Sequence, residues 1–177
     1  MLPPDNNHNS VLKKMNTQLP ILAKNNISAL YSLCDFMNSR GFWTTDRQIR
    51  QDLAKSIYEL FQLFAWSDGV LHTNEYRLLD AALEVDLLYD CHLKELVDAG
   101  PIEEISKPRV PGCLVSAALH DSVHETRFTH IIINHLENLA LIILMSDSKF
   151  ELSEHNAFES YFAELRMSYY ANPSPAV

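Results

Sequence analysis

The sequence predicts an all-α protein. Apolar residues recur at spacings of three and four along most of the chain, no segment alternates apolar and polar residues with a period of two, and one helix-turn-helix pattern occurs twice. The chain has 177 residues, of which 47% are hydrophobic, so it is long enough to bury a core as one domain. We therefore expect residues 19–171 to form a single bundle of about six to eight helices.

Apolar spacing defines the helices of the first half of the chain. Residues 1–18 begin with a segment rich in Pro and Asn, and we expect them to form a disordered tail, with Met15 as an alternative functional start. Beyond this tail, the recurring apolar residues predict helices over 27–37, over 47–66, from Thr73 onwards and over 88–98.

A single break separates these helices from those of the second half. The segment SKPRVPG, residues 106–112, contains two prolines and a glycine, which do not fit a helix interior. We interpret it as a connector within one domain. After the connector, the same spacing predicts helices over 113–120, 126–145 and 152–169, and residues 172–177 are expected to form a flexible tail.

The stretch LFAWSDGVLHTNEYRLLD, residues 63–80, resembles the second half of a calcium-binding loop. If Asp68 is the fifth position of such a loop, Glu75 is the twelfth, where a bidentate glutamate is usual. The first and third positions then fall on Phe64 and Trp66, whose side chains have no oxygen ligand. The usual calcium loop is therefore excluded, and the stretch predicts a corner between two helices.

The corner occurs a second time. When the sequence is shifted along itself so that Asp68 falls on Asp147, Glu75 falls on Glu154. The flanking apolar positions coincide as well, in the pairs Leu53 and Ile132, Ile57 and Leu136, Leu63 and Ile142, Phe64 and Ile143, Leu79 and Phe158, and Leu83 and Phe162. We therefore expect residues 50–85 and 129–164 to form two helical hairpin units related by a pseudo-twofold axis.

This repeat also predicts the core. The apolar stripe of each hairpin should be buried, because an amphipathic helix turns its apolar face toward its neighbours. The residues expected inside are Leu53, Ile57, Leu60, Phe64, Leu79, Leu83, Ile132, Leu136, Ile143, Phe158 and Phe162.

Charge limits the partners that the chain can bind. The 14 Lys and Arg residues against 23 Asp and Glu residues give a formal net charge of −9, which is the wrong sign for a phosphate-binding surface. We expect no nucleic-acid partner. Cations or basic proteins fit this charge better.

The cysteines and the apolar runs bear on location. Cys34, Cys91 and Cys113 are odd in number and form no CxxC pair, and the first ten residues lack the features of a signal peptide. The longest apolar run, LALIILM at 139–145, is far shorter than the roughly 20 residues that span a bilayer. We expect a cytoplasmic protein without a transmembrane segment.

The repeated corner resembles the TerB-like family of helical domains, named for tellurite-resistance protein B. The shared pattern is a long apolar helix that ends at an Asp, followed by an inward-facing apolar residue, a Ser or Thr that caps the next helix, and a Glu in its first turn. The resemblance covers roughly residues 25 to 170. It implies an all-α domain of two repeated units that acts in stress response without enzymatic activity, beside a protein partner, including a membrane-protein partner at the inner membrane.

The resemblance also implies a metal site. Acidic residues near the corners bind a divalent cation in tellurite-resistance members, and the matching residues here are Asp68, Glu75, Asp147 and Glu154. Calcium, magnesium and manganese favour such oxygen ligands. A carboxylate in the first turn of a helix is also stabilised by the helix dipole without an ion, and this alternative stays open.

The histidines support an alternative. His120 and His124 lie one helical turn apart, as zinc ligands do, and His120-Asp121, preceded by His92 and followed by Asp147, is similar to the ligand order of the HD-type metal-dependent phosphohydrolases, which are also all-α. No Gly-rich phosphate loop or other catalytic motif is present in the sequence. The sequence therefore favours a binding module over this hydrolase.

Overall fold

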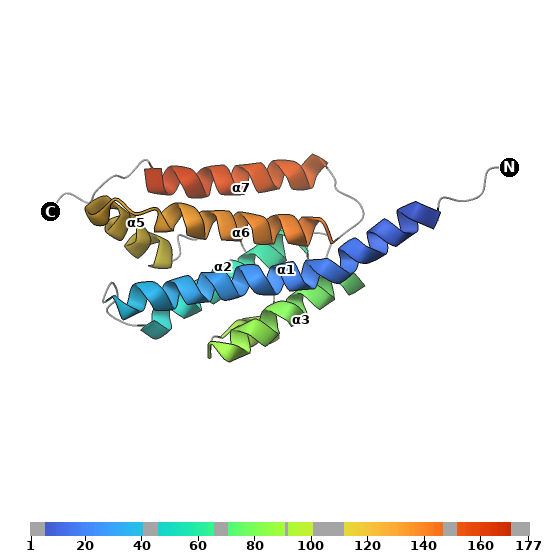
Figure 1. Ribbon diagram of the computed structural model, residues 1–177, viewed down its shortest axis with the longest axis horizontal. Coiled ribbons are helices and arrows are strands. Elements are labelled where there is room, and N and C mark those ends of the chain that lie inside the picture. Colours follow the sequence, from blue (N-terminus) through green and yellow to red (C-terminus); the bar gives the residue numbers. More distant parts are fainter. Residues whose placement is uncertain are drawn as a thin grey trace.

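The computed structural model describes residues 6–40, 46–65, 71–90, 92–100, 112–146 and 152–170. Within these ranges the chain is helical without any strand, which confirms the all-α prediction (Figure 1). The helices are α1 (Asn6–Ser39), α2 (Asp46–Phe64), α3 (Thr73–Leu88), α4 (Leu93–Ala99), α5 (Gly112–His124), α6 (Phe128–Leu144) and α7 (Leu152–Tyr170).

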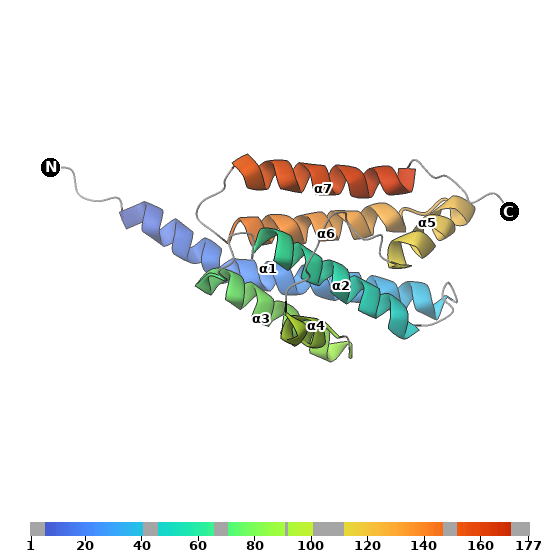
Figure 2. The ribbon, with the colours of Figure 1, turned by 180° about the vertical axis from the view of Figure 1, so that it is seen from behind.

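Helix α1 is the central element of the bundle. It packs most extensively against α3 on one side and against α6 on the other, while α2 contacts α4, α5 and α6. Helix α7 lies along the outer side of α6 (Figures 1 and 2). The core fills the space between these helices, and its largest fully buried side chains include Tyr31, Tyr58, Phe61 and Phe162.

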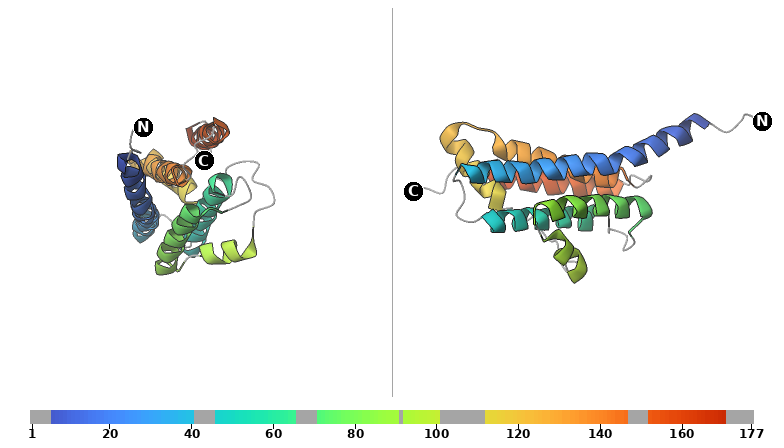
Figure 3. Two further views of the ribbon diagram at one scale, coloured as in Figure 1. Left: turned by 90° about the vertical axis from the view of Figure 1, so that its right-hand side faces the viewer. Right: turned by 60° about the horizontal axis from the view of Figure 1, so that its bottom comes forward.

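The start of α1 corrects the predicted tail. The composition predicts disorder up to residue 18, but α1 begins at Asn6, and residues 1–5 lie outside the described part. Leu19 is the first residue described as buried, and the start of α1 extends past the ends of α3 and α6 (Figures 1 and 3). Once the packed half of a helix is formed, each further residue adds one backbone hydrogen bond, so the helix can extend beyond its packed region.

The predicted core is largely confirmed. All the residues expected inside are buried except Leu83, which is only partly buried, and Tyr76, which fits the same apolar spacing, is 56% exposed. The face of α3 that packs inward carries Leu78, Leu79, Ala82 and Val85. It is rotated slightly from the predicted stripe, so that Leu79 stays buried while Tyr76 is exposed and Leu83 is only partly buried.

The two predicted hairpins match in their boundaries but differ in their packing. Helices α3 and α7 begin at Thr73 and Leu152, two positions that coincide under the shift that defines the repeat. Helix α3, however, packs mainly against α1, whereas α7 packs against α6. The pseudo-twofold relation between residues 50–85 and 129–164 therefore stays a prediction.

The short helix α4 begins later than predicted. The apolar spacing predicts a helix over 88–98, but Leu88 is the last residue of α3, and Asp90 has a positive φ of 51°, which breaks the helix. Helix α4 then ends before Gly100, whose φ of 88° favours glycine. Residues 106–111 of the predicted Pro-rich connector lie outside the described residues. Its last residue, Gly112, is the first residue of α5.

Candidate functional site

The first corner contains a capped helix. Glu75 lies in the first turn of α3 and is 3% exposed. Its Oε2 accepts a hydrogen bond of 2.7 Å from the backbone N–H of His72, and His72 and Glu75 together form a capping box. At least one oxygen of this predicted metal ligand therefore serves the start of α3. Asp68, the other predicted ligand here, lies outside the described residues.

The second corner follows the end of α6. The hydroxyl of Ser146 donates a hydrogen bond of 2.7 Å to the carbonyl oxygen of Ile143 and closes the last turn. Glu154 lies in the first turn of α7 and is partly buried. The predicted ligand Asp147 lies outside the described residues. Both glutamates of the repeat thus occupy equivalent first-turn positions, as the sequence predicted.

The two corners meet at one end of the bundle. The side-chain amide of Asn74, at the start of α3, donates a hydrogen bond of 3.2 Å to the carbonyl oxygen of Ser146, at the end of α6. Figures 1 and 2 place the start of α3, the end of α6 and the start of α7 at this same end. The repeat does not predict this contact, because the shift places Asn74 on Ser153 and gives it no special role in the pattern.

The structure leaves the four-carboxylate metal site as a prediction. Among the residues it describes, no group of three or more His, Cys, Asp or Glu side chains could hold a metal ion. Since two of the predicted ligands fall outside those residues, this finding does not test the complete set.

His120 and Asp121 form a polar cluster at the other end of α6. The carboxylate of Asp121 accepts hydrogen bonds of 2.9 Å from the backbone N–H groups of Phe128 and Thr129, and a third from the hydroxyl of Thr126. Nδ1 of His120 lies 2.7 Å from the same hydroxyl oxygen. Asp121 therefore caps the start of α6, although it belongs to the preceding helix.

This arrangement argues against the hydrolase interpretation of the same residues. Both oxygens of Asp121 accept hydrogen bonds from the start of α6, and His92 pairs with Glu95, with 2.8 Å between Nδ1 and Oε2. The third element of that motif, Asp147, lies outside the described residues. In the part of the chain that the structure describes, His92, His120 and Asp121 do not belong to any group of three or more His, Cys, Asp or Glu side chains that could hold a metal, and we do not propose the phosphohydrolase.

The pKa of Asp121 predicts an acid-sensitive cap. Burial raises this pKa, but the hydrogen bonds from Thr126, Thr129 and Phe128 outweigh burial and leave it below the usual 3.8. A carboxyl group with a lowered pKa in the folded state stabilises the fold above its unfolded pKa, and this stabilisation is lost as pH falls through the folded pKa. Asp121→Ala should therefore cost about 0.5 to 2 kcal/mol near neutral pH.

Urea unfolding at a series of pH values tests this prediction. The difference in unfolding free energy between Asp121→Ala and the unsubstituted protein should narrow below about pH 4. Asp98→Ala is the matched control, because Asp98 pairs with Lys94 on the exposed surface of α4. A loss from Asp121→Ala that is equal at pH 7 and at pH 3 would contradict the assignment.

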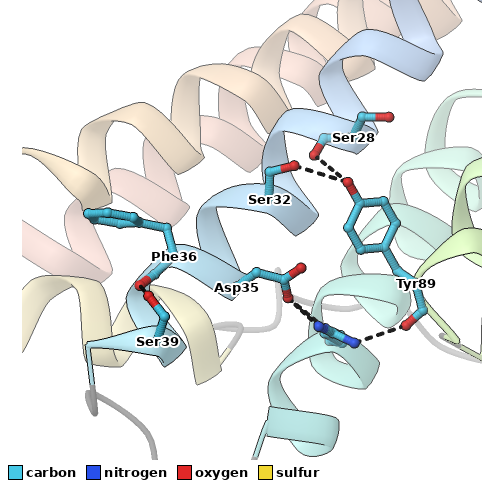
Figure 4. Close-up of polar contacts among 7 residues, drawn as sticks. Ser28, Ser32, Asp35, Phe36, Ser39 and Tyr89 are labelled. Atoms are coloured by element: carbon cyan, nitrogen blue, oxygen red, sulfur yellow. Dashed lines mark hydrogen bonds and ion pairs between the residues drawn. The ribbon is translucent and has the colours of Figure 1, made fainter.

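A second polar cluster joins the first three helices near the end of α3 (Figure 4). The guanidinium group of Arg50 binds the carboxylate of Asp35 and donates a hydrogen bond of 3.1 Å to the carbonyl oxygen of Tyr89. The hydroxyl of Tyr89 in turn lies 3.0 Å from the hydroxyl of Ser32. This cluster could not be predicted from the sequence, since its members are far apart along the chain and form no motif.

Asp86 lies beside this cluster and is 2% exposed. Its Oδ1 accepts a hydrogen bond of 2.8 Å from the hydroxyl of Tyr31, and its Oδ2 accepts one of 2.9 Å from the backbone N–H of Leu93. The carboxylate thus joins α1 to α3 and satisfies the first N–H of α4. Its contacts are those of a structural group that fixes the turn between α3 and α4.

Two thiols meet between α1 and α5. Cys34 and Cys113 are both buried and carry thiols rather than a disulfide, and Cys91 lies outside the described residues. A hydrogen bond with the Cys34 thiol, together with burial, raises the pKa of the Cys113 thiol well above its usual range. The thiolate form is therefore scarce in the folded protein.

Comparison with known proteins gives no relative. No family model, curated protein or solved structure matches the chain. The structure itself defines the class as an all-α bundle whose two corners lie at one end and whose His120 cluster lies at the other. Within the part of the chain that the structure describes, no helix is both long enough and apolar enough to cross a membrane.

Proposed function

We propose that this chain is a non-enzymatic, TerB-like binding module that holds a divalent cation between its two corners and binds a protein partner through its acidic surface. The hydrogen bond from Asn74 to the carbonyl oxygen of Ser146 is the observation that supports this proposal. It joins Asn74 of the first corner to Ser146, the residue before Asp147 of the second, and in the sequence each corner carries an Asp and a Glu.

The proximity of the corners matters for the number of oxygen ligands. One corner offers two carboxylates, and Glu75 already accepts a hydrogen bond at the start of α3. Hard cations such as calcium take six to eight oxygen ligands, so one corner alone would bind weakly. Asp68, Asp147 and Glu154 would supply further oxygen ligands if all of them face one ion.

Charge and the family resemblance suggest the partner. The formal charge of −9 favours a basic protein surface, because opposite charges speed association and oppose like-charged competitors. The resemblance to TerB-like domains adds a cytoplasmic location, a role in stress response and a partner at a membrane. Affinity capture with the unsubstituted protein and with a variant that lacks the corner aspartates would test whether the partner recognises the corners.

Thermal unfolding in the presence of calcium, magnesium or manganese tests the cation. An ion that binds only the folded state stabilises it by about 2.7 kcal/mol at a concentration of 100 times its Kd, so millimolar ion should raise Tm. The double variant Asp68→Asn with Asp147→Asn should lose this response and keep its fold, because asparagine retains the shape of the side chain and removes its charge.

A matched control separates ion binding from general charge effects. Asp80→Asn with Asp98→Asn removes the same two charges from exposed positions on α3 and α4 and should keep the response. If none of the three ions changes the Tm of the unsubstituted protein, the corner carboxylates serve as helix caps and the proposal of a cation site is wrong.

A further inference from the structure

One exposed face of α5 combines two imidazoles with an open hollow. His120 and His124 lie one helical turn apart, and their ring centroids are separated by 4.5 Å. Together with Ser116, Leu119 and Val123 they line a surface hollow of about 200 Å³. Imidazoles four residues apart lie on the same face of a helix, which is the spacing of many helical zinc ligands.

The neighbours of His120 determine which of its nitrogens carries the proton. The hydroxyl of Thr126 has one proton, which it donates to the carboxylate of Asp121. Both oxygens of this carboxylate also accept backbone N–H groups, from Phe128 and Thr129, so Asp121 is the acceptor throughout this cluster. Nδ1 of His120, 2.7 Å from the Thr126 oxygen, must therefore be the donor in that contact.

The consequence concerns the other ring nitrogen. A neutral imidazole carries one proton, so with Nδ1 protonated the lone pair of His120 lies on Nε2. Histidines that bind metals are commonly arranged in this way, with the second ring N–H donated to a hydroxyl, carbonyl or carboxylate that fixes the tautomer. The chain from His120 through Thr126 to Asp121 has this form.

We propose that His120 and His124 form a binding site for a divalent transition metal such as Zn²⁺, with Nε2 of His120 and a ring nitrogen of His124 as ligands. Thr126 and Asp121 act as positioning residues that hold His120 in the binding tautomer. Water fills the remaining coordination positions. Imidazole ligands favour zinc, copper and nickel over calcium and magnesium, so this site differs in chemistry from the corners.

The site is also distant from the corners along the bundle. His120 contacts Phe128, at the start of α6, with 5.0 Å between ring centroids, whereas Asn74 contacts Ser146, just beyond the end of the same helix. Figure 1 places these two regions at opposite ends of α6. The proposal therefore does not depend on the cation site of the proposed function, and different ions test the two.

Titration calorimetry of the full chain with Zn²⁺ is the first experiment. The unsubstituted protein should bind about one Zn²⁺, and His124→Ala should weaken binding at least about tenfold. His124 is exposed, so this variant should keep its fold, as circular dichroism and Tm will check. The control is His130→Ala, which removes an exposed histidine that has Asn134 one turn away, and it should bind Zn²⁺ unchanged.

The positioning residues are tested by substitutions that leave both ligands in place. Thr126→Val should weaken Zn²⁺ binding about 10- to 100-fold, and Thr126→Ser should restore it, because serine keeps the hydroxyl. Nitrogen-15 spectra of the imidazole rings in the metal-free protein should show the proton of His120 on Nδ1. With Cu²⁺ as the probe, electron paramagnetic resonance should show coupling to two imidazole nitrogens.

Three results would overturn the proposal. They are the absence of binding at millimolar Zn²⁺, full affinity in the His124→Ala variant, and a proton on Nε2 of His120 in the metal-free protein. If His120 served only to support the cap that Asp121 and Thr126 form at the start of α6, His120→Ala would lower Tm, but His124→Ala would leave Zn²⁺ binding unchanged. The calorimetric comparison therefore separates a metal site from a structural cap.

Discussion

Replacing Phe64 with alanine should lower the free energy of unfolding by about 3 to 5 kcal/mol, the cost of removing a fully packed aromatic ring from a core. Phe64 is 3% exposed at the end of α2. Its ring contacts Phe158 and Tyr161 of α7, with centroid distances of 6.2 and 6.5 Å. The substitution thus removes apolar contacts and leaves a cavity where α7 joins the bundle.

Urea or thermal unfolding measures this loss, and Phe36→Ala serves as the control. Phe36 is 44% exposed and contacts Phe128 edge-on, so its removal should cost only roughly 1 kcal/mol. Hydrogen exchange adds a local test, because the Phe64 variant should lose protection in α7 before the other helices. An unchanged Tm in Phe64→Ala would mean that the ring is not packed as described.

Asp86→Ala is the second large effect. The substitution leaves the hydroxyl of Tyr31 and the backbone N–H of Leu93 without their acceptor, and a buried donor without a partner costs about 1 to 3 kcal/mol. Asp86→Asn should cost less, because its amide oxygen can still accept one of the two hydrogen bonds. A double-mutant cycle with Tyr31→Phe measures how much of the loss belongs to that pair.

The pH dependence of Asp86 should have the opposite sign to that of Asp121. Burial raises the pKa of Asp86 above 3.8, against the hydrogen bonds from Tyr31 and Leu93 that lower it. A carboxyl group with a raised pKa in the folded state contributes stability that is full below its unfolded pKa and is lost as pH rises through the folded pKa. Equal slopes of unfolding free energy against pH in the Asp86→Asn variant and the unsubstituted protein would contradict this.

Local patterns predicted much of the fold. The apolar spacing located α2, α5, α6 and α7, and the shift that places Asp68 on Asp147 matched the starts of α3 and α7. These features depend on residues within a few turns of each other, which is the range that hydrophobic periodicity reports. The start of α1 was missed, because the Pro- and Asn-rich composition of the first residues predicts disorder, although a helix that is already formed extends by one backbone hydrogen bond per residue.

Contacts between distant residues could not be predicted. Asp86 is of a residue type that is rarely buried, yet its carboxylate lies inside, where Tyr31, 55 residues earlier, supplies a donor. Asp121 has the sequence context of a metal ligand, but its hydrogen bonds go to the start of α6. In both cases the identity of the partner, rather than the residue type, decides the role.

The buried thiols of Cys34 and Cys113 allow the local opening of the helical bundle to be measured by chemical labelling. Both are buried between α1 and α5, and the raised pKa of Cys113 keeps that thiol in its unreactive form. An alkylating reagent can therefore reach them only while the packing around them opens, so the rate of labelling measures how often the bundle opens there. In a variant in which Cys91 is replaced by serine, the labelling rate reports the local opening of the bundle around Cys34 and Cys113.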